Sequence, residues 1–87
     1  MKQKVHDVSN AELDHRLKAL FGAILDLPVD QVGPELSTQS CERWDSLNQI
    51  HLTNAIEEEF GFAMDFEDQM RMLTYDIALE IVSRHGR

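Results

Sequence analysis

The sequence predicts a small all-α protein: a four-helix bundle of three main helices and one short helix, with a long first loop. Apolar residues recur at helical spacing in several segments, typical N-cap residues stand near the starts of these segments, and no segment shows strand-like alternation or an internal repeat. The chain has 87 residues, of which 43% are apolar and 7% aromatic, so it suits one domain with a modest aliphatic core. We expect residues 1–8 to form a flexible N-terminus and residues 9–85 to form the folded domain.

The first helix is predicted over about residues 10–26. Ser9, followed three residues later by Glu12, has the pattern of a capping box, which marks a helix start. Five apolar residues then follow at spacings that place them on one stripe of a helix: Leu13, Leu17, Leu20, Phe21 and Ile24. This stripe should face the core.

Residues 27–45 are predicted to form a loop. The segment contains Pro28, Gly33 and Pro34, and its hydrophobic periodicity is weak. It exceeds the length of about 12–15 residues beyond which connections in compact domains are uncommon and often functional. We expect one helical turn near Asp30. Three apolar residues should hold the loop against the core: Val29, Val32 and Leu36.

The second main helix should begin after Asp45, a good N-cap residue, and end at Phe60 before Gly61. Its inward stripe is predicted to contain Leu52, Ala55, Ile56 and Phe60.

Two further helices are expected downstream. Asp65 can cap a short helix that runs to about Met70, and Thr74 can cap a final helix. The core-facing residues of the final helix should be Ile77, Ala78, Ile81 and Val82. The methionines of this region, Met64, Met70 and Met72, are expected to fill gaps around the short helix.

The charge of the chain restricts its partners. Eight basic and sixteen acidic residues give a net charge of −8, so nucleic acid and anionic membranes should be repelled and basic protein surfaces favoured.

No apolar run approaches the roughly 20 residues that cross a bilayer, and the N-terminus lacks the apolar core of a signal peptide. The single cysteine, Cys41, cannot form an internal disulfide, and the four histidines lack the spacing of a metal site. We expect a cytoplasmic monomer.

The start of the second main helix is the strongest candidate for a functional site. If Asp45 caps this helix, Ser46 is its first residue, where unpaired backbone N–H groups and the helix dipole favour a phosphate group. Ser and Asp at helix starts usually serve only as caps, so this pattern alone is a weak signal. On the side opposite the inward stripe lie Leu47, Ile50 and Asn54, together with Glu57 and Glu58, which is either ordinary exposed apolar surface or a docking face with a carboxylate rim.

The sequence from Trp44 through Gly61 closely resembles acyl carrier proteins around their modified serine. The match combines Asp45-Ser46-Leu47, a helix of the right length, and the ending Glu57-Glu58-Glu59-Phe60-Gly61; with its flanks the similarity covers about residues 12–83. The resemblance implies a non-catalytic carrier, on which a phosphopantetheinyl transferase moves 4′-phosphopantetheine from coenzyme A to Ser46, flanked by Asp45 and Leu47.

The resemblance also implies partner contacts and cargo. The arm would carry acyl groups as thioesters between acyl-loading and acyl-using enzymes with basic surfaces. The residues expected to meet these partners are Leu47, Ile50, His51, Asn54, Glu57 and Glu58. In the family an acyl chain can also shelter between the helices, and here its walls would be Leu52, Ile56, Ile77 and Ile81.

Some positions differ from the carriers of fatty-acid synthesis. Trp44, Asn48, His51 and Asn54 replace the small, acidic or aliphatic residues that are usual there, which favours a dedicated set of partners. The cargo pathway is therefore either fatty-acid-like or specialised biosynthesis. Two alternatives stay open: a carrier of aminoacyl or peptidyl groups, and an unmodified helical interaction module that binds through Leu47 and Ile50.

Overall fold

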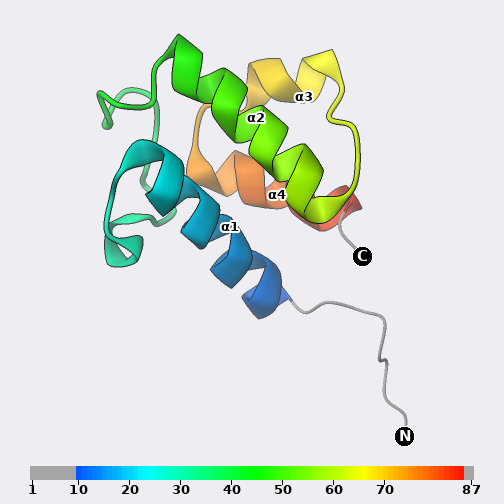
Figure 1. Cartoon of the computed structure of the whole chain (residues 1–87), viewed down its shortest axis with the longest axis horizontal. Helices are drawn as coiled ribbons and strands as arrows, with labels where there is room; N and C mark the ends of the chain where they lie inside the picture. Colours follow the sequence, from blue (N-terminus) through cyan, green and yellow to red (C-terminus); the bar gives the residue numbers. More distant parts are fainter. Residues whose placement is uncertain (1–9, 86–87) are drawn as a thin grey trace, which may run out of the picture.

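The structure is a computed structural model that describes residues 10–85, and it confirms the predicted all-α class. The helices are α1 (Asn10–Leu25), α2 (Ser46–Phe60), α3 (Phe66–Arg71) and α4 (Tyr75–His85), with one turn of 3₁₀ helix, η1 (Val29–Gln31), in the first loop (Figure 1). The three long helices α1, α2 and α4 pack against one another. The short helix α3 and helix α1 lie on opposite sides of α2 (Figure 1). The predicted capping box at the start of α1 involves Ser9, which lies outside the described residues.

The core lies between the three long helices. Its largest fully buried side chains come from all of them and from the connection before α4: Phe21, Leu17, Leu25, Leu52, Ile56, Met72, Tyr75, Ile81 and Val82. Phe21 is its aromatic centre, because both Trp44 and Tyr75 meet its ring edge-to-face with centroids 5.1 Å away. Burial of these apolar side chains, rather than helix propensity alone, stabilises such short helices.

The first loop follows the prediction only in part. The helical turn near Asp30 is confirmed as η1, and Val32 is buried while Leu36 packs against the core. Val29 is exposed, so the prediction that it holds the loop to the core is wrong. It is the first residue of η1 and lies at the surface next to Gly22. Instead Trp44 and Cys41 carry the loop into the core.

Backbone hydrogen bonds join the same loop to the connection between α3 and α4. The Thr38 N–H donates to the Leu73 carbonyl at 3.0 Å, and the Tyr75 N–H donates to the Leu36 carbonyl at 2.9 Å. These two bonds fix the middle of the long loop beside the connection that leads into α4.

The limits of α2 agree with the prediction. Asp45 is the N-cap and its Oδ1 accepts a hydrogen bond from the Asn48 N–H at 2.9 Å. At the other end Gly61 has a left-handed φ of 74°, which side chains other than glycine adopt at a cost, and its N–H donates to the Glu57 carbonyl. In the inward stripe Leu52 and Ile56 are fully buried and Ala55 and Phe60 half-buried, and Thr53 is an additional buried residue that the pattern missed.

The caps of α3 and α4 are also confirmed. Asp65 Oδ1 accepts from the Asp68 N–H at 2.8 Å, and Thr74 Oγ1 accepts from the Ile77 N–H at 3.1 Å. Met64 and Met72 are buried as expected, but Met70 is 62% exposed, so the expectation that it fills a gap is wrong. Met70 lies four residues after Phe66 on a face of α3 that no described helix covers.

Candidate functional site

The candidate site begins where the long loop turns into α2. Asp45 has an extended backbone (φ −103°, ψ −173°), and its carbonyl and carboxylate accept from the N–H groups of Gln49 and Asn48. The Asn48 side chain in turn donates to the Arg43 carbonyl at 2.7 Å. The helix start is thus fixed from the loop side and from the helix side, and Ser46 is confirmed as the first helical residue, with an exposed side chain.

The electrostatics of this helix start favour an anion. The first N–H groups of an α-helix have no intrahelical acceptor. The Asp45 side chain accepts from the Asn48 N–H and the Asp45 carbonyl from the Gln49 N–H, so the N–H groups of Ser46 and Leu47 are left without an acceptor within α2. The helix dipole adds partial positive charge at the same point. A phosphate on the Ser46 oxygen would lie beside these donors, so the residues present fit a phosphate-linked group.

Trp44 supports the site from the inside. Its side chain is 3% exposed and packs on Phe21, and its indole N–H donates to Gln49 Oε1. The Gln49 amide nitrogen donates to the carbonyls of Gln69 and Met72, both at 3.0 Å. Trp44 therefore has a structural role: it orients Gln49, and Gln49 connects α2 to α3 and to the residue after it.

A surface cavity of about 440 Å³ lies beside Ser46. Its walls come from the long loop, the start of α2, α3 and the connection after α3: Thr38, Trp44, Asp45, Ser46, Gln49, Gln69, Met70 and Leu73. The helix start thus opens on a groove with both amide and apolar walls.

The predicted docking residues do not all share one surface. Leu47 and Ile50 are 61% and 57% exposed, and His51, Asn54 and Glu58 are exposed beside them; we call these five residues the docking face. The sixth, Glu57, is half-buried and its Oε2 accepts from the Met64 N–H at 2.8 Å. Glu57 therefore holds the connection before α3, toward one side of the docking face.

Sequence reasoning missed an apolar surface on the neighbouring short helix. Phe66, Met70 and Leu73 are 72%, 62% and 50% exposed. Their spacing of four and three residues was a visible signal, because it places them on one side of a helical segment. Met70 and Leu73 also line the cavity beside Ser46, so they extend the apolar surface from α2 to α3.

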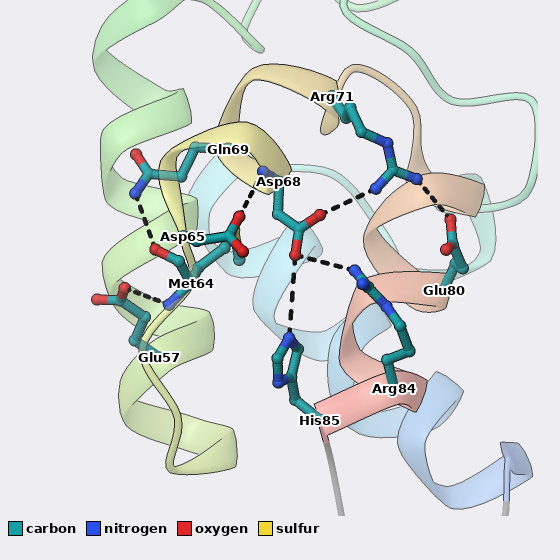
Figure 2. A network of polar contacts seen from close by, with 9 residues as sticks. All are labelled: Glu57, Met64, Asp65, Asp68, Gln69, Arg71, Glu80, Arg84 and His85. Carbon is teal, nitrogen blue, oxygen red and sulfur yellow. Dashed lines mark hydrogen bonds and ion pairs between the residues drawn. The ribbon is translucent and has the colours of Figure 1, made fainter.

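Several acidic residues of α2, α3 and α4 are paired within the protein (Figure 2). Asp68 is buried and accepts from Arg71 and Arg84, both at 2.9 Å, while Arg71 also donates to Glu80 at 2.8 Å. The bond to Glu80, together with the charges of Glu80 and Asp68, raises the pKa of Arg71. The carboxylates available to a basic partner are therefore fewer than the sequence suggests.

Comparison with known proteins decides the family. Residues 15–75, well over half of the chain, match the family described as "Phosphopantetheine attachment site". The chain belongs to this phosphopantetheine-binding family. Members of the family carry a covalently attached phosphopantetheine group and are generally non-catalytic carriers that serve phosphopantetheinyl transferases and acyl-handling enzymes.

A curated relative agrees with the assignment to this phosphopantetheine-binding family. The chain is similar to the acyl carrier protein of Thermosynechococcus vestitus (strain NIES-2133 / IAM M-273 / BP-1), with 28% identity over 76 residues. That alignment covers 87% of this chain and 94% of the relative. Among the described residues, no helix of this family member is long and apolar enough to cross a membrane.

Proposed function

We propose that Ser46 carries the 4′-phosphopantetheine group and that the protein is an acyl carrier for partner enzymes. The observation that carries this proposal is the position of Ser46: an exposed hydroxyl on the first residue of a capped helix, beside N–H groups without acceptors in that helix. A partner enzyme can reach such a hydroxyl from solvent, and the helix start stabilises the phosphodiester that results.

The residues around Ser46 have separate roles in this proposal. Asp45 holds the helix start through its hydrogen bond to the Asn48 N–H, and Leu47 lies next to the modified residue as an exposed apolar contact for the transferase. The attached group supplies a terminal thiol that carries acyl groups as thioesters, and the chemistry on these thioesters belongs to the partner enzymes. The protein itself is proposed to have no catalytic activity.

The composition of the docking face indicates that a partner enzyme recognises it through apolar contacts as well as through charge. Asn54 and His51 stand on it with Leu47 and Ile50, and only Glu58 supplies a carboxylate. A partner that binds here needs apolar pockets for Leu47 and Ile50 and a small number of basic groups at its rim. This composition favours a dedicated partner set, so we place the carrier in a specialised biosynthetic pathway rather than in general fatty-acid synthesis.

Intact mass spectrometry tests the attachment site. The wild-type protein, incubated with coenzyme A and a broad-specificity phosphopantetheinyl transferase, should gain the mass of one phosphopantetheine group. Ser46→Ala should gain nothing, while Ser83→Ala, which removes another exposed helical hydroxyl, should be modified like the wild type. A wild-type protein that stays unmodified, or a Ser46→Ala variant that is still modified, contradicts the proposal.

A further inference from the structure

The face of α2 that is turned toward α3 is polar. Gln49, Thr53 and Glu57 follow Ser46 at intervals of three, four and four residues, so they form one stripe along the helix. Gln49 donates to carbonyls at the end of α3 and Glu57 accepts from the Met64 N–H before its start (Figure 2 shows the latter). The boundary between this stripe and residues 64–72 is called the α2–α3 seam below.

Thr53 lies midway along the seam. Its residue is 5% exposed, and its hydroxyl oxygen has no hydrogen-bond partner among residues 10–85. An alkyl chain offers this hydroxyl no hydrogen bond, so contact with Thr53 stabilises a bound chain less than contact with an apolar side chain of the same size would. The middle of the seam is therefore a poor surface for an alkyl chain.

Gln49 closes the seam at the end nearest Ser46. Its oxygen is occupied by the Trp44 indole N–H, and its nitrogen bonds both the Gln69 and the Met72 carbonyls at 3.0 Å. A chain that passes between α2 and α3 from Ser46 would break these bonds and leave the indole N–H and both carbonyls without their partner. Apolar contact with the chain cannot replace a lost hydrogen bond at a buried polar group.

The core residues behind the seam do not belong to the walls of the groove beside Ser46. Leu52, Ile56 and Ile81 are fully buried and packed. Neither they nor Ile77 lines the 440 Å³ cavity, whose walls include the amides of Gln49 and Gln69 and the side chains of Met70 and Leu73. The four residues expected to shelter a chain are thus separate from the walls of the groove, whereas Gln49 is one of those walls.

We propose that this carrier bears short acyl groups, which stay in the groove beside Ser46, and that Gln49 and Thr53 keep long alkyl chains out of the bundle. The exposed side chains of Met70 and Leu73 give the groove apolar walls for a cargo of a few carbon atoms. This inference rests on the proposed attachment at Ser46.

The experiment loads the full chain with acetyl-, hexanoyl- or dodecanoyl-phosphopantetheine from the matching coenzyme A thioesters, and mass spectrometry verifies each load. The readouts are the Tm of each loaded form and the NMR methyl resonances of Leu52, Ile56 and Ile81. For the wild type we expect no rise in Tm from the hexanoyl to the dodecanoyl load, and unchanged core resonances for all three loads. The double variant Gln49→Leu with Thr53→Val has an apolar seam, and its Tm should rise with chain length by about 4–8 °C.

Gln31→Leu is the matched control, because it makes the same change at an exposed site in η1 and should behave like the wild type. A wild-type Tm that rises with chain length, with shifted core resonances, overturns the inference. A double variant that shows no chain-length dependence overturns the role given to Gln49 and Thr53. If the double variant does not fold, the wild-type series decides alone. Failure to load any group counts instead against attachment at Ser46.

Discussion

The buried carboxylate of Asp68 in α3 and the guanidinium of Arg84 in α4 lie 2.9 Å apart and connect the short helix to the last helix (Figure 2). Arg71 contacts the other oxygen of the same carboxylate, and His85 lies 3.9 Å from the oxygen that Arg84 bonds. The His85 ring also stacks on Phe62, with centroids 4.4 Å apart. Side chains of α4 and of the connection before α3 therefore fix the position of α3.

Asp68→Asn should lower the free energy of unfolding by about 2 kcal/mol, because two guanidinium groups then face a neutral amide. The loss is smaller than for a fully buried pair, since about half of each arginine side chain is exposed to water. Urea denaturation measures it. Asp26→Asn is the control: it removes the exposed ion pair with Arg43, keeps a residue that tolerates the left-handed φ of 58°, and should change stability by less than about 0.5 kcal/mol.

Tyr75 makes stability depend on pH in alkaline solution. Its burial, together with its hydrogen bond to the Asp14 carboxylate, raises the pKa of the Tyr75 phenol well above its ordinary value of 10.0. Because the folded state holds this proton more tightly, the stabilisation is complete below about pH 10 and is lost as the pH rises further. Urea denaturation at pH values of about 9 and 11 should show this fall in the free energy of unfolding.

Tyr75→Phe isolates that contribution. The variant should lose about 1 kcal/mol at neutral pH, because the Asp14 carboxylate loses a donor but keeps its ion pair with Lys18 at 3.2 Å. Its stability should fall less between the two alkaline pH values than that of the wild type. Tyr75 is the only tyrosine in the chain, so phenolate absorbance follows its titration directly. Equal falls in both proteins would contradict the prediction.

Asp45→Ala should lower the free energy of unfolding by about 1 kcal/mol, the usual effect of losing an N-cap acceptor. Ser46→Ala should leave stability within about 0.5 kcal/mol of the wild type, because the Ser46 side chain is exposed and caps nothing. Asp45→Ser keeps an acceptor for the Asn48 N–H and should restore most of the loss. Thermal unfolding of the three variants separates the structural role of Asp45 from the role proposed for Ser46.

Much of the fold could be read from the chain because its signals are local. The caps at Asp45, Asp65 and Thr74 each act on a backbone N–H three residues away, and Gly61 adopts the backbone angles that favour glycine. The exposure of Leu47 and Ile50 follows from counting around the axis of one helix. These features need no knowledge of how the helices pack.

The remaining features depend on residues distant in sequence. Gln49 bonds carbonyls twenty and more residues away, and Trp44 is buried because Phe21 from α1 lies beside it. Val29 and Met70 were misplaced for the same reason, since apolar character does not show which side chains find a partner surface. Whether Thr53 is buried could not be known before α3 was placed beside α2.

The docking face should matter for the rate of modification. Leu47→Ala should reduce kcat/KM for transfer of phosphopantetheine to Ser46 about tenfold, or about 1.4 kcal/mol, since burying an exposed Leu side chain in an interface is worth about 1.5–3 kcal/mol. Stability should stay within about 0.5 kcal/mol, because Leu47 is 61% exposed. Steady-state kinetics with a broad-specificity transferase measures the effect.

The same assay decides whether the interface reaches α3. If Met70 and Leu73 belong to it, Met70→Ala should also lower kcat/KM by several fold, because both residues line the cavity beside Ser46. Val29→Ala removes a comparably exposed apolar side chain from η1, on the first loop away from this surface, and should leave the rate unchanged. A rate that falls equally in all three variants would reflect a general loss of stability or solubility. A rate lowered by Leu47→Ala alone would confine recognition to α2, and the apolar surface of α3 would then have no part in the modification step.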